Sequence, residues 1–202
     1  MTITYRVGDG LYVNMTNKCT NACDFCIRNN GEGAYGSDPL WLEREPTREE
    51  VLCDIEQNWS NGEYTELVFC GYGEPTCRLY DMLWVCKEIK AKSPDIKIRL
   101  NTNGQSDLIW NRDTAPLYKG LVDFISISLN SSDAKKYQEV CHSEFGEAAY
   151  TAMLTFAKNV KSYVPDVAFS VVRGFLSEED IEICRHIADS VGVRLRIREY
   201  IS

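Results

Sequence analysis

Apolar residues follow two different repeats along the chain, and the two repeats take turns from one end to the other. Ile96, Ile98 and Leu100 alternate with polar residues, which is the two-residue repeat of a half-buried strand. After Pro46, apolar residues instead keep helical spacing behind the capping-box sequence Thr47-Arg48-Glu49-Glu50. The first repeat predicts strands over Thr2–Val7, Leu11–Met15, Leu67–Cys70, Ile96–Asn101, Val122–Leu129, Val167–Val172 and Val193–Ile197. The second predicts helices after Thr47, over Leu79–Ala91, Leu108–Tyr118, Ala134–Val140 and Ala148–Tyr163, and from Ser177 to Val191.

This order of elements predicts the fold class. Strands that alternate with helices through short connections become parallel neighbours joined by right-handed crossovers. The turn sequence Gly8-Asp9-Gly10 joins the first two strands as a β-hairpin. About six strand–helix units fit, whereas a closed eight-unit barrel needs roughly 250 residues. We therefore predict an α/β protein, a partial (βα)6 TIM-like barrel with a short N-terminal β-hairpin, in a single domain over residues 1–202.

Composition narrows the function classes only a little. A hydrophobic fraction of 44% is ordinary for a globular protein, and no run reaches the roughly 18 apolar residues of a membrane span. The first residues lack a secretory leader, so we expect a cytoplasmic protein with no membrane partner. The net charge of -8 disfavours nonspecific binding of nucleic acid, so we do not expect a nucleic-acid partner. Nine cysteines without an export signal indicate thiols and metal ligands rather than disulfides.

Three of these cysteines, Cys19, Cys23 and Cys26, have the spacing C-x3-C-x2-C. Three thiolates this close can bind three corners of one iron–sulfur cube and leave the fourth iron open for a substrate or cofactor, whereas such clusters normally take four cysteines. The spacing therefore favours an enzyme. The alternative is a structural zinc site, which needs four closed ligands. Its fourth ligand would come from Cys53, Cys70, Cys77, Cys86, Cys141 or His142. Zinc sites of this kind usually pair two short C-x2-4-C segments, and the sequence has no second one.

The cysteine motif, with the aromatic Phe25 just before its last cysteine, resembles the signature of the radical S-adenosylmethionine (SAM) superfamily. Gly71-Tyr72-Gly73-Glu74-Pro75 resembles the Gly-Gly-Glu-Pro motif of that family, with Tyr72 inserted between the glycines. Looser matches follow in the same order along the chain, namely Asn101–Gly104, Ser126–Asn130 and Val171–Gly174. The narrower resemblance is to short radical SAM proteins that accompany TatD-family nucleases.

The resemblance implies that Cys19, Cys23 and Cys26 bind a [4Fe-4S] cluster and that SAM chelates its fourth iron. One-electron reduction would then give a 5′-deoxyadenosyl radical that abstracts a substrate hydrogen. It also implies an oxygen-sensitive protein that takes its electron from a donor such as flavodoxin or ferredoxin. Phe25 would exclude water, and its backbone would contact the adenine.

The same resemblance implies a set of SAM contacts, each of which has a simpler explanation. The implied contacts are Gly71, Tyr72, Gly73, Glu74, Thr102, Asn103, Ser126, Ser128, Asn130 and Arg173. Glycine, proline and Asn-Gly are also ordinary turn residues, and small polar side chains also pack inside barrels. Arg173 would pair with the SAM carboxylate, or would be a surface residue at a strand end. The insertion of Tyr72 leaves the contacts of Glu74 open.

The other cysteines and the substrate are less constrained. Cys77 and Cys141 are the candidates for donating a hydrogen atom to a substrate radical or binding an auxiliary metal, while Cys53, Cys70, Cys86 and Cys184 fit core positions. For the substrate we expect a small molecule first, a peptide or protein second and RNA third. The alternative function is a non-catalytic regulatory module that binds zinc or an iron–sulfur cluster. This alternative gives the Gly71–Pro75 motif no function.

Overall fold

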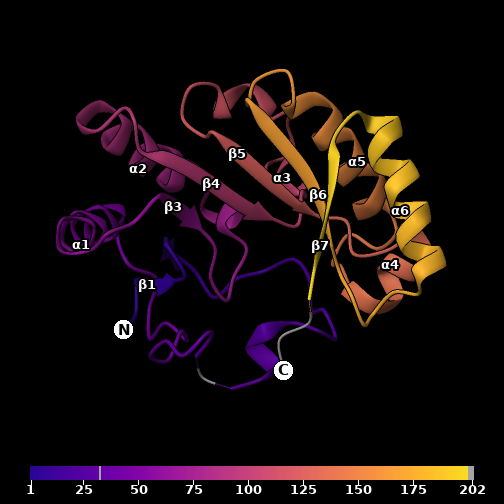
Figure 1. The fold of residues 1–202 in the computed structure, drawn as a ribbon, viewed down its shortest axis with the longest axis horizontal. Helices are drawn as coiled ribbons and strands as arrows, with labels where there is room; N and C mark the ends of the chain where they lie inside the picture. Colours follow the sequence, from indigo (N-terminus) through magenta and orange to yellow (C-terminus); the bar gives the residue numbers. More distant parts are fainter. Residues whose placement is uncertain (32, 200–202) are drawn as a thin grey trace.

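The computed structural model describes residues 1–31 and 33–199, and within them the strands form one sheet in chain order, β1 to β7 (Figure 1). The antiparallel pair is the hairpin of β1 (Thr4–Val7) and β2 (Gly10–Val13). Every later pair is parallel, so β2 and the five strands after it give the six parallel strands of a partial barrel. The remaining strands are β3 (Glu66–Phe69), β4 (Lys97–Thr102), β5 (Phe124–Ser128), β6 (Asp166–Val172) and β7 (Arg194–Arg198). The predicted fold class is confirmed.

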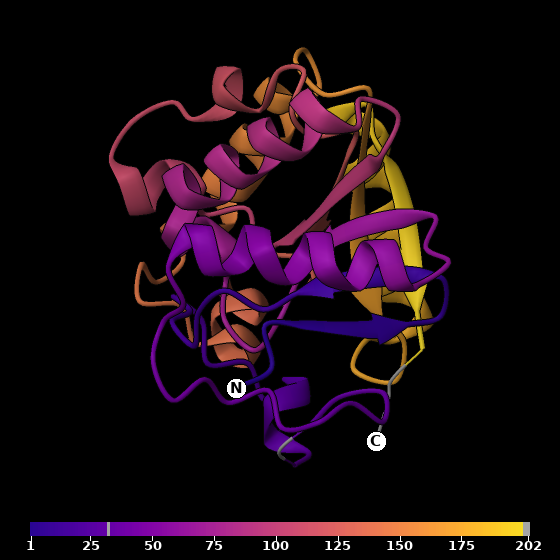
Figure 2. The same cartoon turned by 90° about the vertical axis from the view of Figure 1, so that its left-hand side faces the viewer.

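Helices cover one face of the curved sheet, and the loops of the N-terminal quarter cross one end of it (Figures 1 and 2). Apolar residues of β4 to β6 that point toward the helices are fully buried, for example Ile98, Ile125 and Phe169. The helices are α1 (Arg48–Asn61), α2 (Leu79–Lys92), α3 (Ser106–Trp110), α4 (Ala134–Cys141), α5 (Ala148–Val160) and α6 (Glu178–Val191). No helix in the described ranges is long and apolar enough to cross a bilayer.

The helix starts follow the sequence signals. The Thr47 side chain accepts a hydrogen bond from the Glu50 backbone nitrogen, and the Glu50 carboxylate accepts one from Thr47 nitrogen at 2.7 Å. This reciprocal pair is the predicted capping box of α1. Ser177 caps α6 in the same manner, through the backbone nitrogen of Asp180.

One predicted helix is divided in two. The helix expected over Leu108–Tyr118 is the short α3 followed by the 3-10 turn η3 (Ala115–Tyr118). Asn111, at a left-handed φ of 48°, ends α3, and Pro116 cannot donate a backbone hydrogen bond to continue a helix. Two further 3-10 turns are η1 (Ile27–Asn29), which follows the cysteine motif, and η2 (Pro75–Arg78), which begins at the last residue of the Gly71–Pro75 motif.

The other face of the sheet is polar and lines a cavity. Successive side chains of a strand point to opposite faces, so the neighbours of buried Ile98 and Leu100 point away from the helices. The cavity is lined from this face by Arg99, Asn101, Ser126, Ser128, Ser170 and Arg196, among others. Loops that follow the carboxyl ends of β2 to β5 complete it, which is where parallel α/β folds build their sites.

Candidate functional site

The loop that carries the three cysteines follows β2 and is held against the carboxyl end of α4. Ala22 nitrogen donates to the Cys141 carbonyl at 3.0 Å, and Asp24 nitrogen donates to the Val140 carbonyl at 3.0 Å. Glu144 nitrogen donates to the Thr20 carbonyl at 2.9 Å just beyond the helix. These backbone bonds fix the middle of the loop to a rigid element far away in sequence.

Cys19, Cys23 and Cys26 all line the cavity. Burial raises the pKa of the Cys19 thiol to about 12 and also raises the pKa of Cys26. A hydrogen bond with Cys141 and burial together raise the pKa of Cys23. Within the described residues no three His, Cys, Asp or Glu side chains already converge as metal ligands, and Cys23 faces Cys141. A metal would bind these residues as thiolates and displace their protons.

A buried glutamine ties the cysteine loop to its surroundings. Gln105 is fully buried, and its side-chain oxygen accepts from Thr20 Oγ1 at 2.7 Å and from Ser143 Oγ at 3.1 Å. Its Nε2 donates to Asn21 Oδ1 at 2.8 Å and to the Tyr137 hydroxyl at 3.0 Å. All the hydrogen-bonding capacity of this amide is thereby used, and it ties Thr20 and Asn21, which follow Cys19, to Tyr137 and Ser143.

Gly71 and Gly73 let the loop after β3 pass close to the loop after β2. A Cβ on Gly71 would lie 2.2 Å from Asn14 Oδ1, and one on Gly73 would lie 2.3 Å from the Thr16 carbonyl. Glu74 nitrogen donates to the Lys18 carbonyl at 2.8 Å. The family resemblance implies that these glycines contact SAM. In the structure they first allow the backbone after β3 to support the cysteine loop.

The side chain of Tyr72 is buried and does not point into solvent. Its hydroxyl donates to the carbonyls of Gly31 and Gly33 at 2.9 and 3.1 Å, and its ring packs edge-on against Trp41. Tyr72, the extra residue between the two glycines, therefore holds the segment that follows the cysteines against one side of the cavity.

Glu74 is a buried carboxylate surrounded by donors. It accepts from Thr76 Oγ1 and Thr102 Oγ1, each at 2.7 Å, and from Asn103 nitrogen at 2.7 Å. Burial is the larger effect and raises the pKa of Glu74, while these hydrogen bonds favour its charged form. The carboxylate joins the ends of β3 and β4 and lines the cavity.

The ends of β4 and β5 contribute the remaining predicted contacts on this side. Thr102, Asn103, Ser126, Ser128 and Asn130 all line the cavity. Asn130 is 6% exposed, has a left-handed φ of 55° and directs Nδ2 toward Cys141 Sγ at 3.9 Å. Its Oδ1 is buried without a hydrogen-bond partner in the described part of the chain. An unpaired buried acceptor costs free energy, so it marks a place where a ligand donor is favoured.

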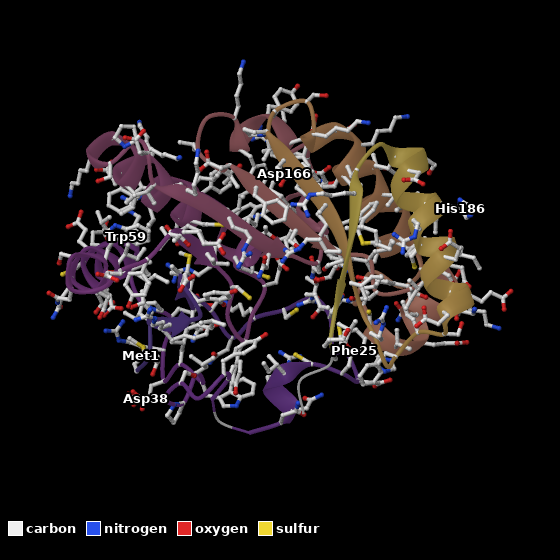
Figure 3. All side chains as sticks on the ribbon, in the orientation of Figure 1. Met1, Phe25, Asp38, Trp59, Asp166 and His186 are labelled. Carbon is white, nitrogen blue, oxygen red and sulfur yellow. The ribbon has the colours of Figure 1, made fainter. Side chains whose placement is uncertain are left out.

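Phe25 closes the cavity from the cysteine loop. Its ring lies 5.0 Å from the ring of Phe175, which follows β6, so two distant loops meet there. Figure 3 shows Phe25 at the opposite end of the strands from Asp166, the first residue of β6. This contact fits the predicted role of Phe25 in excluding water.

Comparison with known proteins decides the family. The profile described as "Radical SAM superfamily" matches residues 13–187, which include the cysteine motif and the strands β3 to β6. The chain belongs to the radical SAM superfamily. Radical SAM enzymes use a [4Fe-4S] cluster and SAM, so the expected enzyme class and cofactors are confirmed at the level of the family. No curated protein matches the chain.

Several solved structures share the fold. SuiB from Streptococcus suis, bound to precursor peptide SuiA, matches with a TM-score of 0.68 and 20% identity over 96% of this chain. A radical SAM methyltransferase from Sphaerobacter thermophilus matches with a TM-score of 0.66 and 13% identity over 97% of this chain. HydG, a maturase of the [FeFe]-hydrogenase, matches with a TM-score of 0.66 and 17% identity over 96%. This chain spans 39%, 68% and 43% of those chains, respectively.

The residues present fit the cofactors that the radical SAM superfamily uses. Three thiols on one loop supply the cluster ligands, and the unpaired Oδ1 of Asn130 lies in the same cavity. The closely packed glycine loop and the ends of β4 and β5 border the same space. The donor set and the cavity are therefore compatible with a cluster and SAM side by side.

Three predicted site residues do not line this cavity. Arg173 is 47% exposed at its side chain and lies 3.7 Å from Glu178 and 3.5 Å from Glu199. Cys141 is fully buried behind Cys23, and Cys77 lies in η2, beyond Glu74. The roles of Arg173, Cys77 and Cys141 in binding or hydrogen transfer stay predictions.

Several residues that line the cavity are not indicated as site residues by any sequence pattern. Cys70 was assigned to a buried strand, yet it borders the cavity beside a group of tyrosines that includes Tyr5, Tyr12 and Tyr35. Arg194, Arg196 and Arg198 alternate with apolar residues, which places all three on one face of β7. What the pattern did not indicate is that Arg196 and Arg198 on this face border the site.

Proposed function

We propose that this protein uses a [4Fe-4S] cluster held by Cys19, Cys23 and Cys26 to cleave SAM reductively and to act on a small-molecule substrate. The observation that supports this proposal is that the three cysteines and the ends of β3, β4 and β5 border one cavity. When bound, the cluster and SAM supply a 5′-deoxyadenosyl radical, which removes a hydrogen atom from the substrate. The protein itself provides position and shielding.

The chain offers complementary groups for each polar part of SAM. The Glu74 carboxylate, already stabilised by donors from Thr102 and Asn103, provides negative charge for the ammonium group. The free Oδ1 of Asn130 and the hydroxyls of Ser126 and Ser128 suit the ribose hydroxyls. Gly71 and Gly73 present backbone groups without side chains in the way, and Arg173 remains the proposed partner of the carboxylate after a movement of its exposed side chain.

Aromatic side chains would keep water away from a radical. Phe25 with Phe175 closes one side, and Tyr72 with Trp41 closes another. Exclusion of water prevents side reactions of reactive intermediates. The electron would come from a cytoplasmic donor such as flavodoxin or ferredoxin.

A peptide is the second candidate substrate. SuiB, one of the structures that share this fold, was solved with a precursor peptide bound. The fold alone does not choose between a peptide and a small molecule.

The test is the yield of 5′-deoxyadenosine. The protein is reconstituted anaerobically with iron and sulfide, reduced with dithionite and mixed with SAM. We expect 5′-deoxyadenosine and methionine from the wild type, and a yield at least tenfold lower from the Cys19/Cys23/Cys26→Ala triple variant. Iron, sulfide and zinc are measured in each sample. A preparation that binds only zinc, tightly and through these cysteines, would favour the regulatory module instead.

A further inference from the structure

Three arginines border a cavity in a protein whose net charge is -8. Arg99 lies on β4, and Arg196 and Arg198 lie on β7, all on the inner face of the sheet. Arg196 pairs in register with Ser170, and Arg198 pairs with Val172, which also border the cavity. None of the three belongs to the residues that the family resemblance assigns to SAM. Their place in the cavity therefore calls for another partner.

The two β7 arginines lack the partners that balance the other arginines on this face. Arg194, earlier on the same face, pairs at 2.6 Å with Asp166, which is labelled in Figure 3. Among the described residues, the side chain of Arg196 makes one polar contact, a long one of 3.5 Å to Ser126 Oγ, and otherwise lies over the Phe124 ring. Within residues 1–31 and 33–199, no carboxylate lies within 4.0 Å of Arg196 or Arg198.

Arg99 adds a further free donor. Its Nη2 donates to the Tyr12 hydroxyl at 2.7 Å and lies 3.0 Å from Glu66 Oε1. Its Nε is buried without a hydrogen-bond partner in the described residues. A buried N–H without an acceptor is unfavourable, and an oxyanion in the cavity would supply one.

The electrostatics of the cavity point in the same direction. Burial, together with the neighbouring charges of Arg99, Arg194 and Arg198, lowers the pKa of Arg196. The charges of Arg198 and Arg99 also act to lower the pKa of Tyr35 and of Cys70, although burial raises both overall. Glu66 opposes this effect on Arg196, and Glu74 opposes it on Cys70, but the charges of Arg99 and Arg198 still reach the tyrosine side of the cavity. An anion is the ligand that relieves this repulsion.

The geometry points to a substrate that carries an oxyanion, either a carboxylate or a phosphate, bound by Arg196 and Arg198, with Arg99 bordering the same cavity. Guanidinium groups bind both anions through paired N–H donors. The organic part of this small molecule would lie toward Tyr12 and Tyr35, which border the same cavity. This inference rests on the proposed function, since it assigns the substrate of the same site.

The test compares three reconstituted proteins: the wild type, the Arg196→Gln/Arg198→Gln double variant and the Arg194→Gln control. Calorimetric titrations at constant ionic strength use glutarate, inorganic phosphate and the uncharged analogue glutaramide. We expect glutarate or phosphate to bind the wild type and the control, and to bind the double variant at least tenfold more weakly. Glutaramide should not bind. The better of the two anions identifies the group as carboxylate or phosphate.

Two results would overturn the inference. One is equal anion affinity in the wild type and the double variant, or no anion binding to the wild type. The other is loss of the SAM-induced change in the cluster EPR spectrum in the double variant, because the arginines would then hold SAM itself. If the double variant is misfolded by circular dichroism, the single variant of exposed Arg198, Arg198→Gln, and the charge-keeping Arg198→Lys are compared instead. Failure of the proposed function would appear separately, as a wild type that binds anions but yields no 5′-deoxyadenosine.

Discussion

Gln105 illustrates how a single residue positions the site without belonging to a family motif. It lies just after Asn103-Gly104, which the sequence marked as a turn, and nothing in its own pattern distinguished it from a surface glutamine. Its partners Asn21 and Tyr137 are 84 and 32 residues away along the chain. Such a network depends on the tertiary fold, so sequence spacing could indicate the cysteines but not the residue that holds their loop.

We predict that Gln105→Leu weakens the cysteine loop. The substitution removes four hydrogen bonds and leaves Thr20 and Asn21 without these partners, at a cost of about 3 kcal/mol. Iron content after reconstitution should fall by more than half, and the free energy of unfolding should fall as measured by anaerobic urea titration. The control is Gln57→Leu, on the exposed face of α1, which should change neither quantity. Normal iron content in Gln105→Leu would refute the positioning role.

At the scale of elements, local sequence signals predict a helix start correctly where a capping side chain determines it. The capping box at Thr47 and the cap at Ser177 appear as expected. The prediction of a single helix over Leu108–Tyr118 was wrong, because Asn111 in a left-handed conformation and Pro116 divide the segment. The hydrogen bond by which Tyr72 holds the segment after the cysteines joins residues far apart in sequence, so no local pattern contains it.

Asp180 connects α6 to α4 and should give a pH-dependent contribution to stability. Its carboxylate accepts from Ser132 at 2.6 Å and from Lys136 at 2.7 Å, and these hydrogen bonds lower its pKa to about 2. A carboxyl group with a depressed folded-state pKa stabilises the fold above its unfolded pKa of about 3.9, and loses this effect as the pH falls toward 2.

We therefore expect Asp180→Asn to lower the free energy of unfolding by about 1 kcal/mol at pH 7, a value kept small because the pair is partly exposed to solvent. The difference from wild type should narrow in urea titrations between pH 4 and pH 3. Glu179→Gln, in the same first turn of α6, controls for the general effect of charge at a helix start. A difference that stays constant with pH would contradict this assignment.

At the scale of the whole molecule, parallel order brings distant motifs together. The cysteine loop follows β2, and the glycine loop follows β3, so adjacent carboxyl ends meet at one cavity. The sequence could predict this meeting, because order and handedness leave few alternatives. It could not predict that β7 places arginines at the same cavity, since alternation alone does not say which face lines a site. The sequence also could not predict the position of Arg173, which forms ion pairs with the exposed residues Glu178 and Glu199.

The central claim is that Cys19, Cys23 and Cys26 hold a cluster with one iron free to bind SAM. The most direct measurement is the EPR spectrum of the dithionite-reduced, reconstituted protein before and after addition of SAM. We predict a [4Fe-4S]⁺ signal whose g values shift when SAM is added, and loss of the signal in the triple alanine variant. A fully loaded cluster whose spectrum is the same with and without SAM would contradict the claim.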